Sequence, residues 1–495
     1  MGKIILSSKT FLTYTLGCRV NQAEISAISS QLSAISMEIF GKAKHAFPDI
    51  VLINTCAVTQ KAERESRKAI HHFKRIYPKA KVISLGCAAK FIKDADLVIE
   101  NIDKENSLKI IFRRFPDLNT PRRSPFGKLR ATIRGEMLIK NPQLLITNYQ
   151  LLSASGRALV KIQEGCNQFC AYCIVPYLRG KPKSTPVKEI ICQINHLVQN
   201  GIKEIILCGI NLSLYGIDSS SSPQNDKQRM PQNDTSSHPE RSEGSCSNLT
   251  FLLKQILKKT KAERISLSSI EPEYLYENRE FVELFLKERR FSKYFHLALQ
   301  SGSSDNLKNM GRKTDLKKLL KTLRFIKEKY PEFTFRADII AGFPTETEKN
   351  SQETLDFIKS TRISFVHSFQ FSTRPGTKTE GFIKSGKWRD LPPATKKERS
   401  KRLMELTKNI QKKEAKKLIG KILSCLIIRK VSGGYEAMAG NSWTVRISHQ
   451  PALLASRRSG RRGRSSAIGS QTLIGKILPI KIIGFENNYL LAAGF

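Results

Sequence analysis

Three cysteines stand at CxxxCxxC spacing in the stretch Gly165–Cys173, namely Cys166, Cys170 and Cys173. They lie so close in the chain that their thiolates must share one site. Thiolates are soft ligands that suit iron–sulfur clusters or zinc, and a cubane cluster with only three cysteine ligands keeps one iron open for chemistry. The fold must therefore present this loop as a single site, and the other elements can be placed around it.

Zinc and a disulfide framework are the two alternatives for these cysteines. Structural zinc usually has four ligands in paired CxxC or Cys/His sets, and no His or fourth Cys lies within a dozen residues of Cys173. Ten cysteines in 495 residues are far below the density of a small secreted disulfide scaffold. Both alternatives are disfavoured, disulfides more strongly than zinc.

An aromatic residue, Tyr172, precedes the third cysteine, and with it the loop resembles the cluster loop of radical S-adenosylmethionine (SAM) enzymes. The resemblance implies a 4Fe-4S cluster on Cys166, Cys170 and Cys173, which would be the catalytic residues, with Tyr172 against the adenine of SAM. It also implies that the open iron binds the amino and carboxylate groups of SAM and that a 5′-deoxyadenosyl radical is released.

The composition indicates a soluble, multidomain protein with a nucleic-acid partner. A chain of 495 residues exceeds one hydrophobic core, so two to four domains are expected. It has no apolar run long enough to span a membrane and no signal-peptide pattern, so we expect a cytoplasmic protein with reduced thiols and no membrane partner. Lys plus Arg number 84 against 43 Asp plus Glu, a net charge of +41. Such a field attracts polyphosphate, above all nucleic acid; a general bias towards lysine is the alternative.

Residues 1–118 are expected to form a small α/β domain in which three strands end at cysteines. The strand candidates end at Gly17-Cys18, Asn54-Thr55-Cys56 and Gly86-Cys87, and helical patterns follow them. Alternating strands and helices predict a parallel sheet, in which ligands bind at the carboxyl ends of the strands. Cys18, Cys56 and Cys87 should therefore converge as a second trio of soft ligands. Three unrelated buried cysteines are the alternative.

The sequence segments around these cysteines resemble those of the methylthiotransferases. They are Thr15-Leu16-Gly17-Cys18-Arg19-Val20-Asn21-Gln22, Asn54-Thr55-Cys56-Ala57-Val58-Thr59 and Gly86-Cys87-Ala88. The resemblance implies a second 4Fe-4S cluster on Cys18, Cys56 and Cys87. Together with Lys161–Cys170, the wording is closest to the branch that acts on threonylcarbamoyladenosine in tRNA. The branches acting on isopentenyladenosine and on a ribosomal protein differ at these words.

Residues 152–385 are expected to form six strand–helix units, which fit a partial (β/α)6 radical SAM barrel. Chemistry in such barrels occurs at the carboxyl ends of the strands. Polar sequence segments that resemble those of methylthiotransferases lie at these ends. Four of their residues are assigned to a wall around SAM, at the ends of the second, fourth and fifth strands: Asn211, Gln300, Asp338 and Gly342. Glycine at 342 would let the backbone approach the adenine or ribose.

The remaining stretches are expected to be connections and a small C-terminal domain. Residues 119–150 form a linker or insertion, 218–248 a disordered insertion with a repeated Pro-Gln-Asn-Asp, and 386–420 a charged helical linker. Residues 421–495 should form a small β-barrel similar to the RNA-binding TRAM module, interrupted by a basic insertion at 441–469. Cys192, Cys208, Cys246 and Cys425 are assigned no ligand role. No histidine is assigned to a site, and His296 is expected to pack beside its strand.

The resemblance implies insertion of a methylthio group at C2 of an adenosine beside the anticodon of tRNA, with two uses of SAM. One SAM donates methyl to a sulfur on the N-terminal cluster, and the other gives the radical that attacks the unactivated C–H bond. A reducing partner of flavodoxin or ferredoxin type and a sulfur donor of unknown identity are also implied. The rivals are the isopentenyladenosine substrate, modification of a ribosomal protein, and a non-catalytic iron–sulfur RNA-binding protein.

Overall fold

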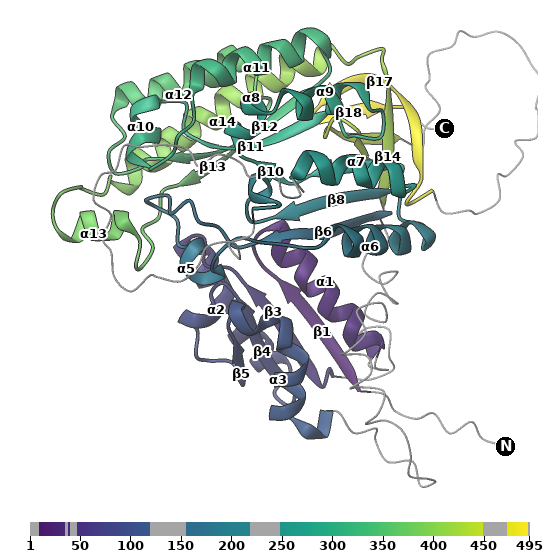
Figure 1. Ribbon diagram of the computed structural model, residues 1–495, viewed down its shortest axis with the longest axis vertical. Helices are drawn as coiled ribbons and strands as arrows, with labels where there is room; N and C mark the ends of the chain where they lie inside the picture. Colours follow the sequence, from purple (N-terminus) through teal and green to yellow (C-terminus); the bar gives the residue numbers. More distant parts are fainter. Residues whose placement is uncertain are drawn as a thin grey trace, which may run out of the picture.

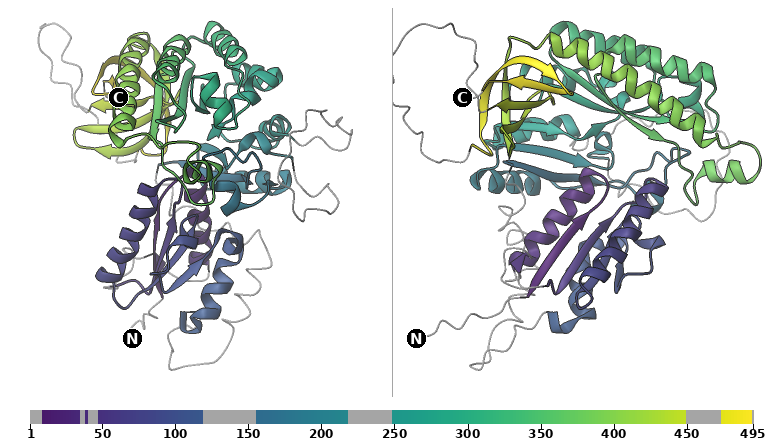
Figure 2. Two further views of the ribbon diagram at one scale, coloured as in Figure 1. Left: turned by 90° about the vertical axis from the view of Figure 1, so that its left-hand side faces the viewer. Right: turned by 180° about the vertical axis from the view of Figure 1, so that it is seen from behind.

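The computed structural model describes residues 9–34, 38–39, 47–118, 155–217, 248–448 and 473–493. Figures 1 and 2 show three parts in chain order: an N-terminal α/β unit in purple and blue, a central sheet wrapped by helices in teal and green, and a yellow C-terminal barrel at the far end of the central part. The predicted fold class, α/β with a C-terminal β-barrel, is confirmed.

The N-terminal part is a five-stranded parallel sheet in the order β2-β1-β3-β4-β5. Successive residues of β3 point to opposite faces: Leu52 joins a core with helices α1 and α3, whereas Val51 and Ile53 join a core with α2. The elements are β1 (Thr10–Thr15), α1 (Arg19–Ala34), β2 (Glu38–Ile39), β3 (Ile50–Thr55), α2 (Gln60–Ile76), β4 (Lys81–Gly86), η1 (Ala89–Phe91), β5 (Leu97–Ile99), η2 (Asn101–Asn106), α3 (Ser107–Arg114) and η3 (Pro116–Leu118).

All six strands predicted for the central part are present, and helices cover their outer face. They form two sheets, β7-β6-β8-β9 and β10-β11-β12-β13, joined where β9 leads into β10 and where Ile265 bridges Phe291. The six strands are β6 (Arg157–Glu164), β8 (Glu204–Gly209), β9 (Arg264–Leu267), β11 (Tyr294–Gln300), β12 (Thr334–Ala341) and β13 (Phe365–Gln370). Their pairings with one another are parallel. The barrel therefore stays open between β6 and β13, as predicted.

The other central elements are the helices and two short strands. They are α5 (Val175–Arg179), β7 (Lys183–Ser184), α6 (Val187–Gln199), η6 (Leu212–Leu214), α7 (Leu249–Lys259), β10 (Ser269–Ile270), α8 (Pro272–Glu277), α9 (Arg279–Lys287), α10 (Ser304–Asn309), α11 (Leu316–Lys329), α12 (Glu348–Thr361), α13 (Lys378–Lys384) and α14 (Pro393–Lys416). Within the described residues, no helix combines the length and hydrophobicity needed to cross a bilayer.

The C-terminal part is a closed barrel in the order β14-β15-β16-β18-β17. Its strands are β14 (Ile422–Val431), β15 (Gly434–Ala439), β16 (Thr444–Ser448), β17 (Ile477–Glu486) and β18 (Tyr489–Ala492). It docks on the amino ends of the central strands, where Arg264 donates to Ser424 O at 2.8 Å and Arg336 donates to Ser442 Oγ at 2.7 Å. The carboxyl ends are left to the cysteine sites.

Three predictions concern stretches that lie wholly or mostly outside the described residues. These are the linker at 119–150, the insertion at 218–248, of which only Asn248 is described, and the basic insertion at 441–469 beyond Ser448.

Candidate active site

Backbone hydrogen bonds fasten the CxxxCxxC loop, which connects β6 to α5. Ala171 donates its N–H to Met310 O at 2.9 Å, and its carbonyl accepts from the Thr379 N–H and hydroxyl at 2.9 and 2.8 Å. Gly165 enters the loop at φ +70°, and a Cβ there would lie 2.1 Å from Lys181 O. Only glycine fits at this position, because a side chain would collide with backbone. The loop is therefore held in one conformation from several sides.

The three thiols of this loop lie close together in a poorly solvated place. Burial raises the pKa of Cys166, Cys170 and Cys173, the last to about 12. The pKa of Cys173 is raised further by the charges of the other two. Arg312 Nη1 lies 3.8 Å from Cys170 Sγ, but this guanidinium is also paired with the Glu271 carboxylate. Among the described residues, Arg312 is the cation that contacts this trio, and the Glu271 carboxylate offsets much of its charge.

The second trio meets at the carboxyl edge of three adjacent strands. Cys56 and Cys87 directly follow β3 and β4, and Cys18 comes three positions after the end of β1; these strands are neighbours in the sheet. Gly17 has φ +93°, and a Cβ on it would lie 2.7 Å from Cys56 Sγ. Burial raises the pKa of Cys56 to about 11, with smaller contributions from Cys87 and Cys18. The structure therefore brings these three cysteines together, as the sequence predicts.

The spacing of both trios suits a cluster better than a single ion. Zinc–thiolate bonds of about 2.3 Å in a tetrahedron place the sulfurs about 3.8 Å apart. Among the described residues, neither trio brings its three sulfurs within 4.8 Å of one another. A cubane takes each thiolate on a different iron and therefore needs a wider set. The donors present fit two clusters with three cysteine ligands each.

Two of the residues assigned to SAM contact the first trio or its loop. Asn211 is buried, and its Oδ1 accepts from the Ser213 N–H at 3.0 Å. Its Nδ2 has no partner in the described structure apart from the nearby Cys166 thiol. The hydrogen bond to Asn211 lowers the pKa of Cys166, against the larger effect of burial. The ring of Tyr172 packs edge-on against Phe343 at 6.4 Å. A buried amide with no partner besides a ligand thiol is a feature that a bound ligand would satisfy.

Two more of the five residues assigned to SAM, Gln300 and Gly342, lie at strand ends with positive φ. Gln300 ends β11 at φ +70°. Gly342 follows β12 at φ +77°, and a Cβ there would lie 2.5 Å from Cγ of Lys396 on α14. Close packing against this helix is therefore one reason for glycine at 342, and the room for SAM expected from the sequence stays a prediction.

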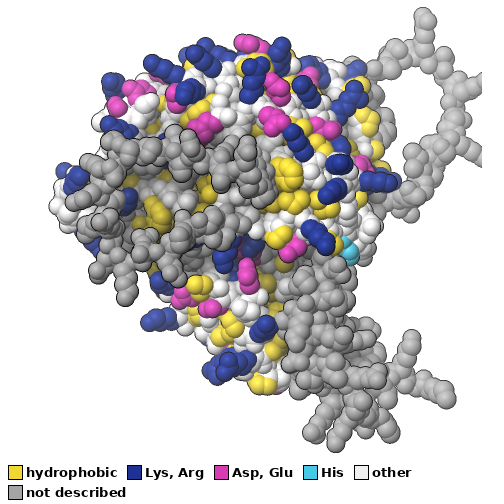
Figure 3. Space-filling model, in the orientation of Figure 1, with side chains coloured by type: hydrophobic (Ala, Val, Ile, Leu, Met, Phe, Trp, Pro, Cys, Tyr) yellow, Lys and Arg dark blue, Asp and Glu magenta, His cyan; other side chains and the backbone are white. Residues whose placement is uncertain are grey.

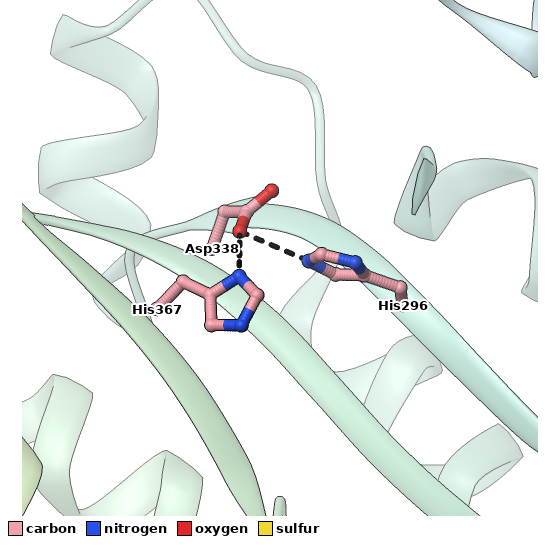
Figure 4. Close-up of side chains that lie close together, drawn as sticks. All are labelled: His296, Asp338 and His367. Carbon is pink, nitrogen blue, oxygen red and sulfur yellow. Dashed lines mark hydrogen bonds and ion pairs between the residues drawn. The ribbon is translucent and has the colours of Figure 1, made fainter. Parts of the chain in front are cut away.

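Asp338 belongs to a histidine cluster that no sequence motif indicates, and His296, expected to pack beside its strand, contacts the Asp338 carboxylate of the neighbouring strand. Figure 4 shows Asp338 of β12 between His296 of β11 and His367 of β13, with its Oδ1 2.9 Å from His296 Nε2 and 3.3 Å from His367 Nδ1. His296 alternates with Phe295 and Leu297 of the outer core, so the cluster faces the barrel interior. The three residues are far apart in the sequence and meet only because β11, β12 and β13 are neighbours.

The histidine cluster is the only described group of three whose ligand atoms lie within 4.8 Å, yet it does not fit a metal ion. A metal-bound imidazole donates its second N–H to an acceptor, but His367 Nε2 faces the guanidinium of Arg336 at 3.2 Å. His367 Nε2 must accept there, so Nδ1 carries the proton and donates to Asp338. Despite burial, the two imidazoles hold the pKa of Asp338 below its ordinary value. The cluster is thus an ionised carboxylate held by two imidazole donors.

A buried ion network joins the two cysteine sites. Arg179, at the end of α5, donates from Nε to Cys87 Sγ at 3.2 Å and from Nη1 to Glu24 and Glu164 at 3.0 and 2.6 Å. Lys104 and Lys161 also pair with Glu24. Burial alone would raise the pKa of Glu24, but these three cations hold it well below its usual range. Arg179 stands only six positions after Cys173, which is the one sequence signal that could have pointed to it.

The remaining cysteines take no part in either trio. Cys208 of β8 packs on Val20 and Ala23 of α1, Cys425 lies inside the C-terminal barrel, and Cys192 is exposed. Cys246 lies outside the described residues.

Two family models match the chain. Residues 160–358 match the radical SAM superfamily, and residues 10–106 match Uncharacterized protein family UPF0004. Among solved structures, the radical SAM methyltransferase TsrM of Kitasatospora setae has a TM-score of 0.47 and 13% identity over 77% of this chain and 78% of that one. At this level the structural likeness carries no further conclusion.

Curated relatives match over most of the chain. The threonylcarbamoyladenosine tRNA methylthiotransferase of Aquifex aeolicus is 33% identical, over 84% of this chain and 92% of the relative. That of Chlamydia pneumoniae is 31% identical, over 86% and 88%. The tRNA-2-methylthio-N(6)-dimethylallyladenosine synthase of Pseudothermotoga lettingae is 28% identical, over 85% and 88%. The chain therefore belongs to the radical SAM methylthiotransferase family.

Proposed function

We propose that this enzyme inserts a methylthio group at C2 of N6-threonylcarbamoyladenosine at position 37 of tRNA. Cys166, Cys170 and Cys173 would hold the cluster that binds SAM, and Cys18, Cys56 and Cys87 a second cluster. When bound, the first cluster and SAM supply a radical able to attack an unactivated C–H bond, which acid–base groups cannot do at this aromatic carbon. The observation that carries the proposal is the pair of separate cysteine trios, each with three ligands.

The chain's own residues would orient the reactants in the barrel. Asn211 presents an amide whose one partner in the described structure is the Cys166 thiol, and Asp338 presents a carboxylate fixed by two imidazoles on the inner face. Ser372 Oγ accepts from Gln60 N–H at 3.1 Å, so the end of β13 is fastened to α2 of the N-terminal part. The two sites are thereby kept in a fixed relation on either side of the open barrel.

A tRNA substrate is supported by the names of the relatives and by charge. The net charge of +41 is of the sign and size that favours binding to a phosphate backbone. Figure 3 shows Lys and Arg side chains spread over the upper part and the right side of the visible face, with acidic side chains among them. Affinity for tRNA should accordingly fall steeply as salt is raised.

The threonylcarbamoyl branch is supported by a half-buried arginine. Arg19 directly follows Cys18 and donates from Nη1 to Leu267 O at 3.2 Å, which brings it to the end of β9. Burial lowers the pKa of Arg336, and the positive charge of Arg19 lowers it further. Among the described residues, no carboxylate pairs with Arg19. A guanidinium without an anion favours a substrate that brings one. The threonylcarbamoyl group carries a carboxylate, and the dimethylallyl group is a hydrocarbon.

The second candidate substrate is N6-isopentenyladenosine at the same position of tRNA. It is favoured by relatives such as the dimethylallyladenosine synthase of Bacillus subtilis, which is 28% identical over 87% of this chain. A flavodoxin- or ferredoxin-type reductant and a separate sulfur donor would complete either reaction.

Mass spectrometry of tRNA nucleosides from cells with and without the gene tests the substrate. We expect the methylthio derivative of threonylcarbamoyladenosine to disappear with the gene; loss of the isopentenyl derivative instead would select the second candidate. In the purified enzyme, Arg19→Gln should lower kcat/KM for the threonylcarbamoyl substrate about 10- to 100-fold, because a hydrogen bond to a charged group contributes about 1.5–3 kcal/mol. An unchanged value would remove Arg19 from substrate recognition.

A non-catalytic RNA-binding protein is tested separately. Anaerobically reconstituted protein with a reductant should cleave SAM to 5′-deoxyadenosine. Tight tRNA binding with no cleavage would support that rival and exclude the enzyme.

A further inference from the structure

Arg179 connects the two cysteine sites by its position in the chain and by its contacts. It ends α5, which begins two residues after Cys173, so its backbone belongs to the first site. Its side chain is only 1% exposed and reaches into the second site, where Nε donates to Cys87 Sγ at 3.2 Å. The sulfur also accepts from Asn101 Nδ2 at 3.3 Å. Cys87 is therefore a sulfur with two hydrogen-bond donors, one of them charged.

The charges around Arg179, of which Lys161 and Glu164 are partly exposed, do not balance without the sulfur. The cations are Arg179, Lys104 and Lys161, and the carboxylates that pair with them are Glu24 and Glu164. Three positive charges thus face two negative ones. A buried cation needs a counter-charge, and Cys87 supplies it when it ligates iron as a thiolate.

The shape of arginine matters for this arrangement. Its planar fork offers five N–H donors in fixed directions, whereas lysine has one compact ammonium. Here Nε donates to the Cys87 sulfur, Nη1 donates to Glu24 and Glu164, and Nη2 donates to Asn21 Oδ1 at 2.6 Å. A lysine at 179 would keep the charge and lose most of these bonds.

Within the described residues, no charged donor lies as close to a sulfur of the first trio as Arg179 lies to Cys87. The guanidinium of Arg312 lies at 3.8 Å from Cys170 Sγ and is paired with Glu271, so its field at the sulfur is offset. Hydrogen bonds and net charge at the ligand sulfurs set the reduction potential of an iron–sulfur cluster. Clusters at the two sites are therefore expected to have different reduction potentials.

We propose that Arg179 is a positioning residue that raises the reduction potential of the second cluster through its hydrogen bond to Cys87. One-electron reduction by a low-potential donor adds a negative charge to the cluster and its ligands, and the guanidinium hydrogen-bonded to Cys87 stabilises this more negative state more than the oxidised one. Glu164 opposes the effect, because its carboxylate offsets part of the charge of Arg179. The inference rests on the proposed second cluster.

The test uses the full chain with Cys166, Cys170 and Cys173 all replaced by alanine, reconstituted anaerobically with iron and sulfide. About four irons per chain are expected, since one cubane then remains. Iron-free protein would overturn the second cluster and the inference with it. With iron present, the midpoint potential is measured by dithionite titration followed by electron paramagnetic resonance, so the two proposals can fail separately.

Four variants in this background decide the role of Arg179. Arg179→Met should shift the midpoint to lower potential and Arg179→Lys should shift it less, while Glu164→Gln should shift it to higher potential. Arg374→Met is the matched control: this buried arginine pairs with Glu63 at 2.6 Å between the same two parts of the molecule and contacts no cysteine, so the potential should stay unchanged. An iron-loaded Arg179→Met protein with an unchanged potential contradicts the inference. If that variant holds no iron, Glu164→Gln decides: a shift to higher potential supports the inference, and any other result overturns it.

Discussion

The two cysteine trios provide the same ligands by opposite means. Cys166, Cys170 and Cys173 lie within eight positions of one another, and a loop bound by its backbone to Met310 and Thr379 holds them. Cys18, Cys56 and Cys87 span 70 positions and are collected by the order of strands in a sheet. A contiguous site depends on loop conformation, whereas a dispersed site depends on the integrity of the whole domain and on its neighbour.

The largest expected effect comes from the contiguous trio. Cys170→Ala should abolish SAM cleavage and tRNA modification together, because both need the cluster of this loop. Liquid chromatography of 5′-deoxyadenosine and nucleoside mass spectrometry measure the two activities. Residual SAM cleavage at the wild-type rate would place the radical chemistry elsewhere.

Cys56→Ala separates the two trios. We expect it to lower bound iron by about half, to leave SAM cleavage intact and to stop methylthio insertion, since only the second cluster is lost. Iron analysis and the same two assays check this. If Cys56→Ala still inserted sulfur, the division of labour between the trios would be wrong.

Gly17→Ala tests how closely the dispersed trio is packed. A Cβ at 2.7 Å from Cys56 Sγ should displace that sulfur and reduce iron retention at the second site during gel filtration. The control is Gly201→Ala, which has a similar φ of +87° and no atom within 4 Å of the new Cβ. It should lower stability by about 1 kcal/mol and leave the iron content unchanged. Equal iron loss in both variants would attribute the effect to backbone strain alone.

The smallest effect is expected at the boundary between the two parts. Arg374→Met leaves Glu63 without the partner that, with Arg67, holds its pKa below the ordinary value against burial. Because Glu63 is partly solvated and keeps Arg67, the loss should be about 1–2 kcal/mol, less than for a fully buried pair. Urea denaturation measures it, and a loss above about 4 kcal/mol would show that the N-terminal part cannot fold undocked.

The features best predicted from the sequence are those that local pattern determines. The strands, the open barrel and the convergence of Cys18, Cys56 and Cys87 result from hydrophobic runs and from the rule that parallel strands end at one edge. Side chains that meet without any sequence motif to mark them were not predicted to do so. His296, Asp338 and His367 come from three neighbouring strands and share no motif, and Arg179 acts on a cysteine 92 positions away. The packing of Gly342 against the side chain of Lys396 is likewise not visible in the sequence, because the two residues lie 54 positions apart.

Helix α14 has a mechanical consequence for the whole molecule. Its 24 residues extend about 36 Å. Near its start Arg399 donates to Glu346 at 2.7 Å, just past the end of β12, and near its end Glu414 accepts from Lys327 at 2.9 Å before the chain enters β14. Alongside the contacts that Arg264 and Arg336 make with the C-terminal barrel, this helix therefore gives a second connection, from the start of β14 to the carboxyl end of β12 near Asp338 and Gly342. A displacement of the C-terminal barrel would be transmitted through α14 to that strand end.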